Sequence, residues 1–177
     1  MCGISIVISK NNKNIINDVI NSLEQIQNRG YDSVGIAMKS NEYWNIEKSA
    51  SINNEDGLTK LQEKIINKST TMALAHTRWA THGSKSERNS HPHTSMNNNI
   101  ILVHNGIISN FQELKNFLRE KNYTFYSETD TEVIANLIEY YLKDNDIETS
   151  IRLTSDNMIG TWALGIINTL EPDNIYI

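Results

Sequence analysis

Cysteine is almost missing from this chain: its 177 residues contain one, Cys2, directly after the first methionine. One cysteine cannot form a disulfide within the chain, and this fits a reducing compartment such as the cytoplasm. No apolar run approaches the ~20 residues that a membrane-spanning helix needs. The apolar segment 4–8 also lacks the preceding basic residues of a secretory signal. We therefore expect a cytoplasmic protein that has no membrane partner.

Positive charge is scarce as well, with 16 Lys and Arg residues against 21 Asp and Glu residues and a net charge of −5. The basic residues form no stripe, which argues against binding to nucleic acid. Two histidines flank Pro92, but the acid and thiol ligands of a usual zinc site are absent at typical spacings. The sequence has no Gly-rich phosphate loop and no GxSxG elbow. We expect no metal and no cofactor.

Hydrophobic periodicity predicts alternating strands and helices in one domain of this length. The predicted strands are 4–8, 34–38, 42–46, 72–76, 100–103 and 161–167. The predicted helices are 15–26, 58–66, 111–118, 129–141 and 147–153. These elements indicate layered sheets covered by helices, the α+β class. A further strand begins at 174–177 with no closing tail, so we expect a domain truncated at its C-terminal end.

Cys2 is a candidate nucleophile because of its place in the chain. Once Met1 is removed, which a small second residue usually permits, residue 2 carries both a thiol and a free α-amine. An α-amine is partly unprotonated near neutral pH and can take the thiol proton directly or through one water. The alternative is that a lone cysteine is a small buried hydrophobe. Cys2 by itself does not decide between them.

The predicted strand 100–103 leads directly into His104, Asn105 and Gly106. An Asn side-chain amide and a Gly main-chain N–H suit a developing oxyanion, because glycine allows close approach of the backbone. Asn-Gly is also a strong signal for a hairpin turn. For an isolated Asn-Gly pair the turn is the favoured interpretation.

Two further places could bind a charged substrate. The polar segment 77–99 is long and aperiodic, which is typical of functional loops, and its first three residues are Thr77, Arg78 and Trp79. Arginine can grip a carboxylate with two parallel hydrogen bonds, and an indole could cover a pocket. Alternatively, Arg78 pairs with a surface acid and Trp79 packs into the core. Asp130 could hold an ammonium group, but its plainest role is helix capping beside a capping box of Thr129 and Glu132.

Five motifs occur together in a fixed order along the whole chain. They are Met1-Cys2-Gly3-Ile4, Arg29-Gly30-Tyr31-Asp32-Ser33, His76-Thr77-Arg78-Trp79-Ala80-Thr81-His82-Gly83, His104-Asn105-Gly106 and Ser127-Glu128-Thr129-Asp130-Thr131-Glu132. Together they resemble the glutaminase domain of the glucosamine-6-phosphate synthase family (glutamine–fructose-6-phosphate aminotransferases), a branch of the class II glutamine amidotransferases.

This resemblance implies a fold: an N-terminal-nucleophile four-layer αββα sandwich of class α+β. It implies that 1–177 is one incomplete glutaminase domain without the sugar-isomerase domains. The implied partner is L-glutamine. Fructose 6-phosphate would bind only to the isomerase domains that this chain lacks, and the full-length protein would form a homodimer.

The resemblance also implies the reaction and the role of each site residue. Cys2 attacks the glutamine side-chain amide and forms a thioester, and its α-amine serves as general base and then as acid. Asn105 and Gly106 stabilise the oxyanion. Arg78 binds the α-carboxylate and Asp130 the α-ammonium of glutamine.

The remaining implied roles belong to the glutamine loop and its surroundings. Thr81, His82 and Gly83 would complete the glutamine loop. Trp79 would gate the passage of ammonia, and Arg29 would support the amine of the nucleophile. Two alternatives stay open: a truncated, non-catalytic module that binds glutamine or a partner synthase, and another class II amidotransferase with a different ammonia acceptor.

Overall fold

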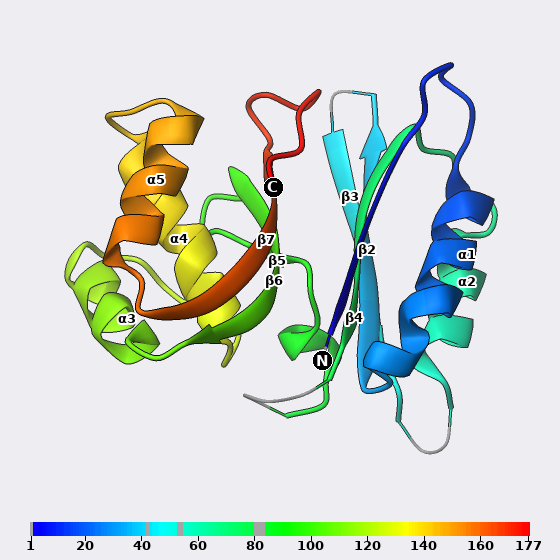
Figure 1. Cartoon of the computed structure of the whole chain (residues 1–177), viewed down its shortest axis with the longest axis horizontal. Coiled ribbons are helices and arrows are strands. Elements are labelled where there is room, and N and C mark those ends of the chain that lie inside the picture. Colours follow the sequence, from blue (N-terminus) through cyan, green and yellow to red (C-terminus); the bar gives the residue numbers. More distant parts are fainter. Residues whose placement is uncertain (1, 42, 53–54, 80–83) are drawn as a thin grey trace. The chain divides into compact units, whose positions relative to one another are not determined.

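The computed structural model describes residues 2–41, 43–52, 55–79 and 84–177. The chain divides into two compact units, Met1–Pro92 and His93–Ile177, and each has its own sheet and core (Figure 1). Within the described residues, no helix has the length and apolar character needed to cross a membrane.

The first unit contains a four-stranded antiparallel sheet in the order β1-β4-β2-β3. Its elements are β1 (Gly3–Ile8), α1 (Ile16–Ile26), the 3₁₀-helix η1 (Gln27–Arg29), β2 (Ser33–Ser40), β3 (Tyr43–Ala50), α2 (Gly57–Ile65), β4 (Met72–Arg78) and the 3₁₀-helix η2 (Glu87–Asn89). Gly3 pairs with Thr77, and Ser33 pairs with Arg78. The first residues of β1 and β2 therefore both lie beside the end of β4.

Helices α1 and α2 cover one face of this sheet (Figure 1). Their apolar residues recur at helical spacing, so one stripe of each helix faces the strands. Val19 and Leu23 of α1 and Leu61 of α2 are fully buried in this core. The packing of these helices holds β4 in place at the centre of the sheet.

The second unit contains a three-stranded antiparallel sheet in the order β5-β6-β7. Its elements are β5 (His93–Thr94), β6 (Ile100–Ile108), α3 (Phe111–Glu120), α4 (Asp130–Leu142), α5 (Ile147–Asn157) and β7 (Gly160–Asn168). Tyr176 forms an isolated bridge to Ile166 of β7.

Alternation along β6 decides which of its side chains face the helices. Ile100, Leu102 and Ile108 pack in one cluster with Ile134 and Ile138 of α4. Because successive side chains of a strand point to opposite faces, Asn105 lies on the face away from α4.

Each of the predicted strands between residues 4 and 167 is present, and so are the five predicted helices. The boundaries differ most at β6. The predicted strand 100–103 continues to Ile108, because residues 104–108 also pair with β7. The aperiodic segment 77–99 contains the end of β4, η2 and β5. The α+β class is confirmed, with helices against one face of each sheet.

Candidate active site

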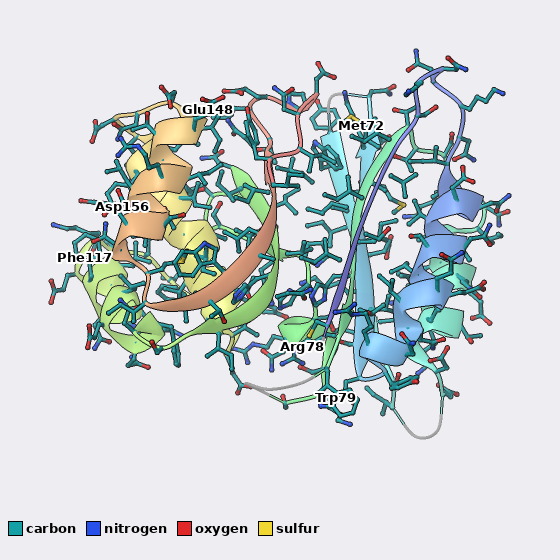
Figure 2. All side chains as sticks on the ribbon, viewed as in Figure 1. Met72, Arg78, Trp79, Phe117, Glu148 and Asp156 are labelled. Atoms are coloured by element: carbon teal, nitrogen blue, oxygen red, sulfur yellow. The ribbon has the colours of Figure 1, made fainter. Side chains whose placement is uncertain are left out.

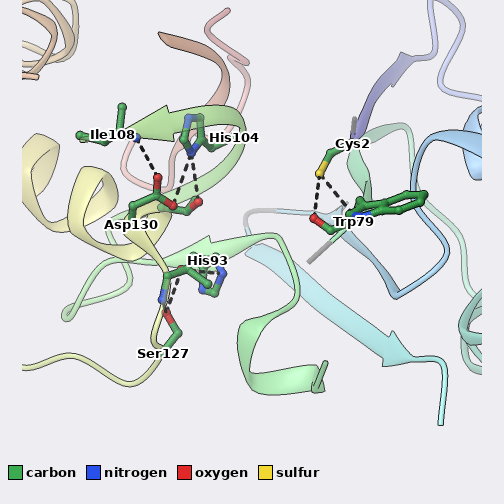
Figure 3. Close-up of polar contacts among 9 residues, drawn as sticks. Cys2, Trp79, His93, His104, Ile108, Ser127 and Asp130 are labelled. Atoms are coloured by element: carbon green, nitrogen blue, oxygen red, sulfur yellow. Dashed lines mark hydrogen bonds and ion pairs between the residues drawn. The ribbon is translucent and has the colours of Figure 1, made fainter. Parts of the chain in front are cut away.

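The thiol of Cys2 is bound to the main chain of Trp79 (Figure 3). The Trp79 N–H donates to Sγ at 3.2 Å, and the thiol donates to the Trp79 carbonyl oxygen at 3.6 Å. Trp79 directly follows β4, and Cys2 directly precedes β1. The side chain of Cys2 is only partly buried, so this cysteine is not a core hydrophobe.

Gly30 lies against the main chain at the end of β4. A Cβ atom on residue 30 would come within 2.6 Å of the Arg78 carbonyl carbon. The Asp32 N–H donates to the Arg78 carbonyl oxygen at 3.1 Å. The segment that contains Gly30 and Asp32 therefore touches the same peptide group whose N–H reaches Cys2.

Arg78 is buried, with 4% of its surface exposed, although it ends a strand. Its Nη1 donates to the Ser84 carbonyl oxygen at 3.4 Å, and the Asn89 side-chain amide donates to the same oxygen at 3.1 Å. Arg78 thus binds the main chain that follows segment 80–83. Figure 2 shows Met72 at one end of β4 and Arg78, followed by Trp79, at the other end.

Trp79 is not a core residue, because 51% of its surface is exposed. Thr81, His82 and Gly83, predicted to complete the glutamine loop, lie outside the described residues. Arg29 is the last residue of η1 and is exposed. The role of Arg29 in supporting the amine of Cys2 stays a prediction.

Asn105 and Gly106 lie inside β6, opposite Ala163 and Trp162 of β7. The alternative of a hairpin turn at Asn-Gly is therefore wrong. Gly106 has a φ of 139°, and a Cβ atom there would lie 1.9 Å from the Thr161 carbonyl oxygen. Only glycine fits both requirements.

Asp130 is the first residue of α4 and is buried. Its Oδ2 accepts the Ile108 N–H at 3.0 Å, and its Oδ1 lies 3.9 Å from Nδ1 of His104 (Figure 3). The interpretation of Asp130 as a helix cap is wrong, because the cap position belongs to Thr129. The carboxylate instead binds the last residue of β6, two positions beyond Gly106.

His104 stands beside this carboxylate and is itself buried. Burial lowers the pKa of the His104 imidazole, while the Asp130 charge and the Thr161 main chain act in the opposite direction. Its Nδ1 lies 3.2 Å from Oγ1 of Thr131. The His104 ring therefore lies between the end of β6 and the first residues of α4, beside Asp130 and Thr131. Sequence reasoning missed this contact, since it joins two elements.

The capping box predicted for Thr129 and Glu132 is also wrong. The Thr129 side chain makes no cap hydrogen bond; its Oγ1 lies 3.1 Å from Nε2 of His93. The buried Glu132 carboxylate accepts the N–H groups of Tyr126 at 2.6 Å and Ser127 at 2.5 Å. These contacts pin the loop before α4, and so they fix where Asp130 begins the helix.

The histidines around Pro92 have other contacts. The His91 ring stacks on His76 with centroids 4.1 Å apart, and His93 binds Thr129. No group of three or more His, Cys, Asp or Glu side chains in the described ranges is arranged to hold a metal ion.

Comparison with known proteins identifies the family of this chain. Residues 61–168 match the family model described as a glutamine amidotransferase domain. A probable glutamine–fructose-6-phosphate aminotransferase (isomerizing) of Acanthamoeba polyphaga mimivirus is 37% identical over 178 residues, covering 99% of this chain and 29% of the relative. The glutamine–fructose-6-phosphate aminotransferase (isomerizing) of Caldanaerobacter subterraneus is 45% identical over 175 residues, covering 99% of this chain and 28% of the relative. The chain therefore spans less than a third of these relatives.

Solved structures show the fold. Glutamine phosphoribosylpyrophosphate amidotransferase from B. subtilis matches with a TM-score of 0.76 at 24% identity, covering 96% of this chain and 35% of that one. A structure described as the allosteric regulatory enzyme of purine biosynthesis matches with a TM-score of 0.77 at 25% identity, covering 94% of this chain and 35% of that one. The expected N-terminal-nucleophile amidotransferase fold is thus confirmed. The chain belongs to the class II glutamine amidotransferase domain family.

Proposed function

We propose that this chain hydrolyses the side-chain amide of L-glutamine to glutamate and ammonia, with Cys2 as the nucleophile after removal of Met1. One observation carries the proposal. The only thiol of the chain is partly exposed and bound to the main chain of Trp79, on the residue that would carry the terminal amine.

The chemistry follows from that residue. The α-amine takes the thiol proton, and Sγ forms a bond to the amide carbon of glutamine. Negative charge then develops on the amide oxygen, where the Asn105 side chain and the Gly106 N–H donate hydrogen bonds. Such a donor contributes about 2.7–4 kcal/mol to transition-state stabilisation.

The intermediate collapses when the carbon–nitrogen bond breaks and the ammonium form of the terminal amine protonates the leaving ammonia. A thioester on Cys2 remains. Water attacks this thioester while the amine again acts as base, and glutamate and the free thiol are released.

Glutamine carries a carboxylate and an ammonium group, so its site needs a cation and an anion at separated points. Arg78 supplies the cation and Asp130 the anion. Thr81, His82 and Gly83 complete the glutamine loop. Trp79 gates the passage of ammonia, and Arg29 supports the amine of Cys2.

The acceptor of the ammonia is proposed from the names of the relatives. Both of the relatives described above are glutamine–fructose-6-phosphate aminotransferases, of which this chain spans less than a third. The chain would act in the cytoplasm as the glutaminase part of glucosamine 6-phosphate synthesis. Fructose 6-phosphate and the homodimer contact would belong to the parts of these relatives that lie outside the matched region.

The test uses the 177-residue chain after intact mass has verified the removal of Met1. We expect 6-diazo-5-oxo-L-norleucine to label Cys2 and glutamine to yield glutamate. Cys2→Ser should nearly abolish both, since a hydroxyl ionises far less than a thiol. Folded, processed protein that binds glutamine in calorimetry but is neither labelled nor active would contradict the proposal. So would activity in a preparation that retains Met1 or carries an acetylated terminal nitrogen.

A further inference from the structure

We propose that the peptide group between Arg78 and Trp79 is a polarised hydrogen-bond donor that favours the thiolate of Cys2, and that Gly30 and Asp32 hold this peptide in place. The proposal concerns positioning residues within the first unit. Its catalytic meaning rests on the proposed function of Cys2.

The peptide has a partner on each side. Its oxygen, the Arg78 carbonyl, accepts the Asp32 N–H at 3.1 Å. Its N–H, that of Trp79, donates to Sγ of Cys2 at 3.2 Å. Hydrogen bonds in series polarise one another, so a peptide whose oxygen accepts a bond is a stronger donor at its nitrogen. A continuous chain of main-chain groups therefore ends on the sulfur.

The two ionisation states of the sulfur use this main chain differently. A neutral thiol both accepts the Trp79 N–H and donates to the Trp79 carbonyl oxygen, and the latter bond is long at 3.6 Å. Loss of the proton removes that weak bond and makes the bond from the N–H a charge-assisted one. Hydrogen bonds to ionised acceptors are about twice as strong as neutral ones. The balance therefore moves toward the thiolate.

Gly30 explains why the peptide stays in position. A Cβ atom on residue 30 would lie 2.6 Å from the carbonyl carbon of Arg78 and 2.9 Å from both its nitrogen and its oxygen. These are main-chain atoms of a strand that pairs with β1 on one side and β2 on the other. They cannot move aside as the end of a flexible side chain can. Any side chain at residue 30 would displace the peptide from Cys2.

The test must leave the charges of the surrounding segments unchanged. The segments that hold the Arg78–Trp79 peptide carry Arg29, Arg78 and Asp32, and Asp32 forms an ion pair with Lys85. The terminal amine of the processed chain is a further charged group near Cys2. Trp79→Pro keeps all of these groups and removes one N–H. The extended conformation of Arg78 in β4 is the one that a residue before proline prefers. Trp79→Phe keeps the N–H and is the matched control.

The experiment measures the rate of alkylation by iodoacetamide against pH, with circular dichroism to check folding. Because the chain has one cysteine, all thiol alkylation reports on Cys2. We expect Trp79→Pro and Gly30→Ala to react about tenfold more slowly near neutral pH. Trp79→Phe should stay within about twofold of the unmodified sequence. Equal rates for the folded Pro and Phe variants would overturn the proposal.

A second measurement needs no variant. The amide proton of Trp79 should move downfield in NMR spectra as Cys2 ionises, with the same pH midpoint as the alkylation rate. An amide chemical shift that does not change with this ionisation also overturns the proposal. Neither measurement uses glutamine. A chain that fails to hydrolyse glutamine but shows the linked amide shift contradicts the proposed function and supports this inference. A chain that hydrolyses glutamine but lacks the linked amide shift supports the proposed function and contradicts this inference.

Discussion

A Cβ atom on Gly106 would lie 1.9 Å from the carbonyl oxygen of Thr161, the residue that pairs with Ile107 across β6 and β7. The glycine also has a φ of 139°, which side-chain-bearing residues rarely adopt. The Gly106 N–H, proposed as an oxyanion donor, therefore lies at a position of β6 that only glycine can occupy.

Gly106→Ala should be strongly destabilising. The new methyl group collides with main-chain atoms, and the backbone must leave its φ value, so we expect the free energy of unfolding to fall by about 2–3 kcal/mol. Urea unfolding followed by circular dichroism measures this change. A loss below about 0.5 kcal/mol would show that β6 and β7 can separate easily at this point.

Asn105→Ala is the matched comparison on the neighbouring residue. Asn105 lies on the face of β6 away from α4, and its φ is not in the positive region that Gly106 occupies. We expect a small change in stability but a fall in kcat of about 10²-fold, because an oxyanion donor is lost. Unchanged kcat would remove Asn105 from the oxyanion site.

Substitutions at Asp130 separate its charge from its hydrogen bond. Asp130→Ala leaves the buried N–H of Ile108 without an acceptor and should cost about 1–3 kcal/mol of unfolding free energy. Asp130→Asn retains an oxygen for that N–H and should fold with smaller loss. Because the negative charge is gone, its KM for glutamine should rise about tenfold or more. If both variants keep the original KM, Asp130 is only a structural acceptor.

Arg78→Lys tests the proposed carboxylate clamp. A lysine can still donate to the Ser84 carbonyl oxygen, the bond that Nη1 of Arg78 makes, but it cannot form two parallel bonds to a carboxylate. We expect a rise in KM of about tenfold with little change in kcat. Steady-state kinetics of glutamate release decide the matter, and an unchanged KM argues against the clamp.

The stability of the chain should depend on pH through His104. Burial lowers the pKa of this imidazole in the folded state, so below about pH 6.5 the unfolded chain binds a proton more readily than the folded chain does. The free energy of unfolding should therefore fall as the pH drops from neutrality toward the folded pKa. Urea unfolding between pH 7.5 and 5 measures this fall.

His104→Asn is the control for that titration, because it places a polar atom near Thr131 without a group that titrates in this range. The difference in unfolding free energy between the unmodified chain and this variant should shrink as the pH falls. A difference independent of pH would assign the acid sensitivity to other groups.

The sequence alone determined the class of the fold and nearly all of its elements. Apolar residues at spacings of two and of three to four mark which face of a strand or helix is buried, and this information is local. Residues such as Leu23, Leu61 and Leu102 are buried as their spacing predicts. The candidate nucleophile was also visible, because its chemistry depends on its place as the second residue of the chain.

Only the tertiary structure decided how the chain uses its polar motifs. Asn105 and Gly106 have the composition of a turn, yet pairing with β7 keeps them in a strand. Asp130 and Glu132 stand in the first turn of α4, where the sequence predicts helix capping, yet they accept hydrogen bonds from Ile108 and from the loop before α4. Main-chain donors carry no side-chain signature. Which carboxylate binds which N–H therefore depends on strand register and close approach between distant segments, and these exist only once the chain has folded.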